Sequence, residues 1–137
     1  MSQANAVDGR TLLGALGGVI VIPILSSILT LFLGAYDAHW NSTEEEPKVE
    51  ILLALLAISS AASFIGGYLA ATIAGGRRWG AVISVGVIVT FLNLMATIFG
   101  QNQNPIWYSC LSVAMPAAAI LLGRMVQQKY PISPWHN

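Results

Sequence analysis

The sequence predicts an all-α integral membrane protein, a four-helix bundle with both termini in the cytoplasm. Hydrophobic residues make up 55% of the 137 residues, charged residues make up only 9%, and the mean hydropathy is +0.69. Soluble domains carry about 25% charged residues. The apolar residues form four runs, each long enough to cross a hydrocarbon core of about 30 Å. Most of the charged residues lie between these runs, as expected for a chain that crosses a membrane four times.

The four predicted spans form a single transmembrane domain over residues 1–137. They comprise residues 11–36, 49–74, 79–99 and 106–126. The first apolar run, of about 24 residues, exceeds the roughly 7 to 15 residue core of a signal peptide, so we expect it to be a retained span. Two prolines and the lack of apolar periodicity predict a mobile tail over residues 130–137.

The turn between the second and third spans determines the predicted topology. Gly75 and Gly76 can end a helix because glycine adopts the left-handed conformation without steric cost. Arg77 and Arg78 follow, and an arginine at the centre of a bilayer costs about 2.5 to 3.5 kcal/mol on insertion scales, so they mark a membrane surface. Five of the six basic residues fall on this side of the predicted membrane, and only Lys48 falls on the other. This asymmetry predicts cytoplasmic termini.

Small and polar residues predict how the two central spans pack. The second span carries small residues four apart, including Ser63 and Gly67, which allow another backbone to approach closely. The non-aliphatic residues of the third span share one helical face, and they are Gly86, Thr90, Asn93 and Thr97. A turn centred after Gly76 places residues whose numbers sum to about 153 at equal depth. The predicted pairs are Asn93 with Ser60, Thr90 with Ser63, and Gly86 with Gly67.

Asn93 has two interpretations, because it is the only side-chain amide inside a predicted span. In the first, the amide forms a hydrogen bond with the second span near Ser60 and holds the helices together. In the second, the polar stripe faces a pore or pocket, since polar groups within a membrane are candidates for function. Pro23 and Pro116 fall near mid-membrane, and interrupted helices can frame a transport site, although many membrane helices contain proline without one.

The middle of each predicted span lacks Asp, Glu, Lys, Arg and His. This argues against proton-coupled export, haem ligation by paired histidines and intramembrane metalloproteolysis. His39 falls in the outer loop, His136 falls in the tail, and Cys110 is the only cysteine, so no Ser-His or Cys-His pair is predicted. Asp37 and His39, with the acidic residues that follow, lack the spacing of a metal site. We therefore expect no catalytic residue, no cofactor, no metal and no enzymatic activity.

Two segments in the second half of the chain carry several local features in the same order. GGYLAATIAGGRRWGA at residues 66–81 contains a glycine pair, an alanine-rich half-turn and a double-arginine turn. NPIWYSCLSVAMPAAAILLGR at residues 104–124 forms a last span with Pro-Ala-Ala and Gly-Arg. In these features the chain resembles small, uncharacterised multi-pass membrane proteins of bacteria. The resemblance implies a four-helix protein of the bacterial inner, or cytoplasmic, membrane, and it implies no activity.

The expected function follows from small-residue faces on all four spans. They favour a structural or accessory subunit that packs against the lipid bilayer and against another copy of itself or a larger membrane protein, with no nucleic-acid partner. The alternative is a small transporter or channel component that uses the stripe of Thr90, Asn93 and Thr97 with the serines of the second span. A polar cavity connected to one side of the membrane would favour transport, whereas an outward small-residue face would favour the accessory role.

Overall fold

A computed structural model describes residues 9–36, 49–75, 79–99 and 105–131 of the chain. Within these ranges the protein forms four helices and no strand, which confirms the all-α part of the predicted fold class. The helices are α1 (Gly9–Tyr36), α2 (Val49–Ile73), α3 (Trp79–Phe99) and α4 (Ile106–Lys129). Each is long and apolar enough to cross a membrane. Relative to the predicted spans, α1 begins two residues earlier and α4 continues three residues further.

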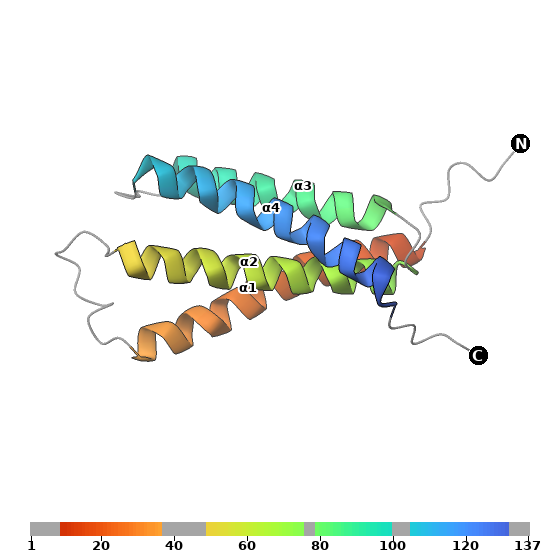
Figure 1. Ribbon diagram of the computed structural model, residues 1–137. Helices are drawn as coiled ribbons and strands as arrows, with labels where there is room; N and C mark the ends of the chain where they lie inside the picture. The colour runs from red at the N-terminus through yellow and green to blue at the C-terminus, as the bar shows by residue number, and fades with distance from the viewer. Residues whose placement is uncertain (1–8, 37–48, 76–78, 100–104, 132–137) are drawn as a thin grey trace, which may run out of the picture.

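The four helices run side by side, and successive helices run in opposite directions (Figure 1). One end of the bundle, which we call the closed end, contains the start of α1, the end of α2, the start of α3 and the end of α4. At the opposite end, which we call the open end, α1 diverges from α2 (Figure 1). The predicted loop of residues 37–48, Arg77 and Arg78, and residues 132–137 of the predicted tail lie outside the described residues.

At the closed end α1 packs tightly on α2 through glycine. A Cβ placed on Gly14 would lie 2.7 Å from the carbonyl oxygen of Ala70, and one on Gly18 would lie 3.2 Å from the carbonyl oxygen of Gly66. The two backbones approach this closely because neither glycine has a side chain, which is how helices gain van der Waals contact in lipid. The same contact buries Ile22 of α1 against Gly66.

The contact between α2 and α4 is the most extensive in the bundle. A Cβ on Gly67 would collide with the backbone of Ile120, and a Cβ on Gly123 would collide with the carbonyl oxygen of Phe64. Glycine therefore lies on both sides of this contact. The backbones of α2 and α4 touch each other in the half of the bundle that belongs to the closed end.

The predicted pairing of α2 with α3 is wrong. Gly67 packs on α4, and no atom lies within 4 Å of a Cβ placed on Gly86. The contact between α2 and α3 is the smallest among the helix pairs that touch. The physical reason is the shape of the inward face of α3, where the β-branched Val82, Val85 and Val89 are buried. These side chains keep the α3 backbone at a distance, whereas α1 and α4 present glycine at the matching depth.

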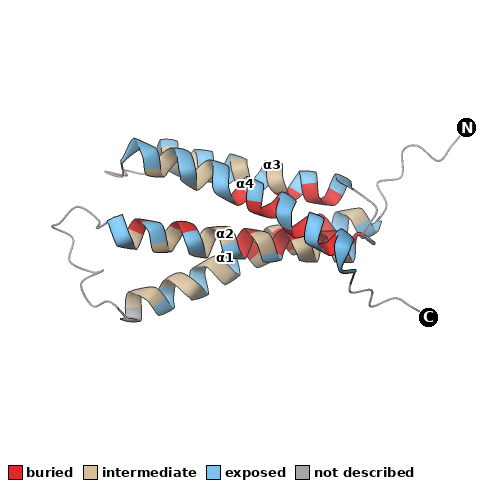
Figure 2. Cartoon of the chain, viewed as in Figure 1, coloured by how far each residue is buried: buried red, intermediate tan, exposed pale blue. Residues whose placement is uncertain are grey.

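Burial differs between the two ends (Figure 2). The buried residues of α3 extend from Ala81 to Val89, and those of α4 from Pro116 to Gln127, so none lies near the open end of either helix. In α1 the last described residue that is buried is Ile22. Pro23 follows immediately, and it cannot donate a hydrogen bond to the carbonyl of Val19. Beyond Pro23, α1 separates from α2 toward the open end (Figure 1). This separation leaves space between the four helices.

Candidate functional site

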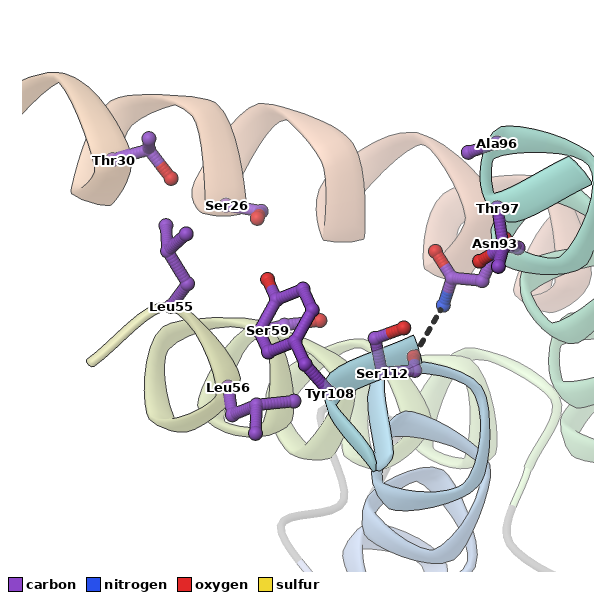
Figure 3. Close-up of a pocket in the computed structure, with 10 residues that line it drawn as sticks. All are labelled: Ser26, Thr30, Leu55, Leu56, Ser59, Asn93, Ala96, Thr97, Tyr108 and Ser112. Carbon is purple, nitrogen blue, oxygen red and sulfur yellow. Dashed lines mark hydrogen bonds between the residues drawn. The ribbon is translucent and has the colours of Figure 1, made fainter. Parts of the chain in front are cut away.

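A partly enclosed polar cavity of about 260 Å³ occupies the space between the helices toward the open end (Figure 3). All four helices contribute to its wall. Its polar residues are Ser26 and Thr30 of α1, Ser59 of α2, Asn93 and Thr97 of α3, and Tyr108 and Ser112 of α4. The remaining lining is apolar and comes from Leu55, Leu56 and Ala96. The wall therefore offers hydroxyl and amide groups without any side chain that is charged at neutral pH.

Asn93 connects α3 to α4 through a carbonyl that a proline leaves without its usual donor. In an α-helix the carbonyl of residue 112 accepts a hydrogen bond from the N–H of residue 116, but residue 116 is Pro116, which has none. The side-chain nitrogen of Asn93 donates to this carbonyl of Ser112 at 3.3 Å (Figure 3). The amide thus replaces the missing backbone donor, as partners from neighbouring helices do in membranes.

Two hydroxyl groups of the cavity wall already donate hydrogen bonds. Thr97 Oγ1 donates to the backbone carbonyl of Asn93 at 2.9 Å, and Ser112 Oγ donates to the carbonyl of Ser109 at 2.9 Å. Each hydroxyl has a single proton, so these two oxygens can only accept a further hydrogen bond. Their positions are fixed by bonds to the backbone of their own helices.

The structure divides the predicted stripe on α3 between two environments. Asn93 and Thr97 line the polar cavity. Gly86 and Thr90 instead line an apolar surface groove of about 430 Å³ between α3 and α4, together with exposed residues such as Val87. The predicted bond from Asn93 to α2 is also wrong, because the amide donates to α4. The expected partner, Ser60, belongs to a helix that α3 barely touches.

Ser60 and Ser63 of α2 lie within one turn of Ser59, on the side toward the closed end. Their hydroxyl oxygens are buried, and within the described part of the chain they form no hydrogen bond. Ser63 has no exposed surface. Gly67 lies one turn further along α2 and packs tightly on Ile120 of α4, so it does not line the cavity. The residues predicted as one set thus serve separate parts of the bundle.

The closed end is held together by an arginine and two tyrosines. The guanidinium carbon of Arg124 lies 4.0 Å from the ring centroid of Trp79, so α4 and α3 form a cation–π contact. Arg124 is only 1% exposed. Tyr68 of α2 donates its hydroxyl to the carbonyl of Tyr130 at 3.2 Å. These contacts join the ends of three helices opposite to the cavity.

The described residues contain no cluster of three His, Cys, Asp or Glu side chains that could hold a metal ion. Cys110 is exposed on α4. The histidines and most of the acidic residues of the predicted outer segment lie outside the described residues, namely Asp37, His39, Glu44, Glu45, Glu46 and His136.

Sequence reasoning identified Asn93 and Thr97 but missed the residues opposite to them. Ser26, Thr30, Tyr108 and Ser112 complete the cavity wall. For α4 the sequence contained a usable signal in Pro116. The carbonyl four residues earlier, that of Ser112, lacks its helical donor and needs one from another helix. For α1 the signal was the pair of hydroxyl residues that follows Pro23 by three and seven positions.

Comparisons with protein-family models, with curated proteins and with solved structures found no match to this chain. The similarity of residues 66–81 and 104–124 to small bacterial proteins therefore stays a prediction. The fold and the composition of its helices support a small multi-pass membrane protein.

Proposed function

We propose that this membrane protein is a transporter or channel component that admits a small polar solute into the cavity at its open end. The observation that carries the proposal is the composition of the cavity wall, to which every helix contributes at least one hydroxyl or amide group. Polar side chains within membrane helices are costly when they face lipid, so they concentrate where they contact each other or water. A cavity of about 260 Å³ is far larger than the roughly 10 to 15 Å³ needed for one water molecule.

The proposed orientation places both termini and the closed end in the cytoplasm. It is supported by five basic residues, which fall in the first turn of α1, between α2 and α3 in the sequence, or in the last part of α4. The cavity then opens toward the exoplasmic side. Five of the six acidic residues fall between positions 37 and 50 of the sequence, the segment predicted to lie on that side. The proposed location in a bacterial cytoplasmic membrane is supported by the resemblance of the double-arginine turn and the last span.

The proposal includes no catalytic step. It is supported by the chemistry of the cavity wall, where hydroxyl and amide groups occur without the base that would activate a nucleophile. Neither a cofactor nor a metal enters the proposed mechanism, and the proposed surroundings are lipid rather than nucleic acid.

A structural or accessory subunit is the second candidate, and the groove beside Gly86 favours it. A Cβ on Gly86 would meet nothing within 4 Å, although the other glycines that face a neighbouring helix are in close contact. The groove of about 430 Å³ is lined mainly by apolar side chains of α3 and α4, the kind of surface against which a helix of a second copy or of a larger membrane protein packs. The two candidates differ in whether function depends on Thr97, in the cavity, or on Gly86, in the groove.

Thiol accessibility tests the proposed function. In a Cys110→Ser background, Ser59→Cys places a thiol in the cavity wall, and Thr90→Cys places one in the apolar groove as a matched control. A charged, water-soluble thiol reagent added from outside should modify the cavity thiol at least tenfold faster than the groove thiol. Equal rates would show that water does not fill the cavity, and the accessory role would then take first place.

A further inference from the structure

Resting on the proposed function, we infer that the cavity binds an uncharged solute rich in hydrogen-bond donors, such as a small polyol. The inference comes from the hydrogen bonds that fix three polar residues of α3 and α4, namely Asn93, Thr97 and Ser112. It names the chemical class of the solute, which the presence of a polar cavity alone does not determine.

The first step is the orientation of the Asn93 amide. A carbonyl oxygen can only accept, so the amide must direct its nitrogen to the Ser112 carbonyl, at 3.3 Å. The amide oxygen consequently points away from Ser112 and into the space between the helices (Figure 3). Pro116 makes this orientation permanent, because the carbonyl has no donor of its own in the helix.

The second step is the balance of acceptors and donors on this wall. Three oxygens can accept from a solute, namely Asn93 Oδ1, Thr97 Oγ1 and Ser112 Oγ. The protons of the two hydroxyl groups are engaged with backbone carbonyls. One N–H of the Asn93 amide remains as the single fixed donor. Among these fixed groups acceptors therefore outnumber donors, and a solute that brings several O–H or N–H groups matches them best.

The third step concerns charge. The ten residues that line the cavity include no acidic or basic side chain. A cation among these oxygens would have no carboxylate to compensate its charge, within a bundle whose outer surface is apolar. An uncharged solute avoids this cost. The hydroxyl groups of the other polar lining residues can rotate, so they adapt to either a donor or an acceptor on the solute. These residues are Ser26, Thr30, Ser59 and Tyr108.

Protection of the cavity thiol measures solute binding directly. The protein carrying Cys110→Ser and Ser59→Cys is reconstituted in vesicles and modified by the water-soluble reagent at increasing concentrations of erythritol. Trimethylamine N-oxide, a neutral solute that accepts hydrogen bonds and donates none, is the comparison. We expect erythritol to slow modification at least fivefold more strongly than the comparison solute at equal concentration. Ser26→Cys gives the same measurement from α1 if Ser59→Cys disturbs folding.

A matched pair of threonine variants on α3 then tests the role of the wall. Thr97→Val removes one acceptor at nearly constant volume, and the loss of a hydrogen bond of typical strength weakens binding about fivefold. Thr90→Val makes the same change in the apolar groove and should alter the half-protecting concentration less than twofold. Equal effects of the two variants would overturn the inferred solute class. Protection by trimethylamine N-oxide or by potassium ions that is as strong as protection by erythritol would do the same. Neither result would contradict the proposal that water fills the cavity. A thiol at residue 59 that does not react at all would instead overturn the proposed function.

Discussion

Replacing Gly67 with alanine tests whether α2 and α4 touch backbone to backbone. The added Cβ would collide with the carbonyl oxygen of Ile120 and would lie 2.8 Å from Ile120 Cα and 2.9 Å from its carbonyl carbon. Carbon atoms that are not bonded rest about 3.5 to 4.0 Å apart, so the two helices must separate by roughly an ångström. All three atoms belong to the backbone, and no side-chain rotation can relieve the overlap.

The expected cost combines two opposing contributions. Overpacking of this kind costs about 1 to 3 kcal/mol, whereas alanine stabilises a helix by about 0.8 to 1.0 kcal/mol relative to glycine. The net loss for Gly67→Ala should be about 1 kcal/mol. Gly86→Ala is the matched control, because nothing lies within 4 Å of the added Cβ and only the helix contribution remains. The free energies of unfolding of the two variants should therefore differ by about 1 to 3 kcal/mol.

The difference can be measured by unfolding the purified protein in mixed micelles with increasing dodecyl sulfate, followed by circular dichroism. Gly67→Ala should unfold at a lower detergent fraction than the unmodified protein, and Gly86→Ala at an equal or higher one. If the two variants unfold together, the close contact between α2 and α4 is absent in the membrane. The assignment of the closed end would then be wrong.

Three further predictions concern a buried hydroxyl, the proline-linked amide and the topology. Ser63→Ala removes a hydroxyl that is buried without a partner in the described residues, so the free energy of unfolding should stay equal or rise by up to about 1 kcal/mol, and a clear loss would show that the hydroxyl is bonded. Asn93→Leu should lower the free energy of unfolding of the unmodified protein by about 1 kcal/mol more than that of the Pro116→Ala variant, because in that variant the Ser112 carbonyl regains its backbone donor. A double-mutant cycle that shows no coupling between the two substitutions would contradict this. In a background without the native cysteine, a thiol at residue 42 should react with an impermeant reagent added outside intact cells, whereas a thiol in place of Gly76 should not; the reverse pattern would mean an inverted protein.

The helices could be predicted closely because their signals are local. A run of apolar residues bounded by charge, proline or glycine determines where a membrane helix begins and ends, and α2 and α3 differ from the predicted spans by at most one residue. The partners of each helix could not be predicted in the same way. Gly67 and Gly86 look alike in the sequence, yet one touches the backbone of Ile120 and the other touches nothing within 4 Å. The difference arises from the valines on the inward face of α3, which keep the backbone of α3 away from α2. Whether α2 then packs on another helix depends on where α1 and α4 have glycine along the bundle.

The cavity was predictable only in part, for a related reason. Asn93 stands out as the only side-chain amide within the four predicted spans, but its partner depends on which carbonyl in another helix lacks a donor. Pro116 identifies that carbonyl as residue 112, and the amide lies 3.3 Å from it. A proline inside a membrane helix therefore defines a position, four residues earlier, at which a donor from a neighbouring helix is needed. Applied to this sequence, the rule identifies the carbonyls of Val19 in α1 and Ser112 in α4 as the two that need a donor, and neither belongs to α2.

The separation of tight packing from the cavity has a consequence for function. Lipid is as apolar as the helices, so little drives the open end to close once α1 has separated from α2 beyond Pro23. The stability of the bundle comes mainly from the glycine contacts of the closed end and from the contact between Arg124 and Trp79. Substitutions in the cavity wall, such as Thr97→Val, remove no contact of that kind. They should therefore change solute binding while the bundle stays folded. The comparison of Thr97→Val with Thr90→Val then measures solute recognition rather than stability.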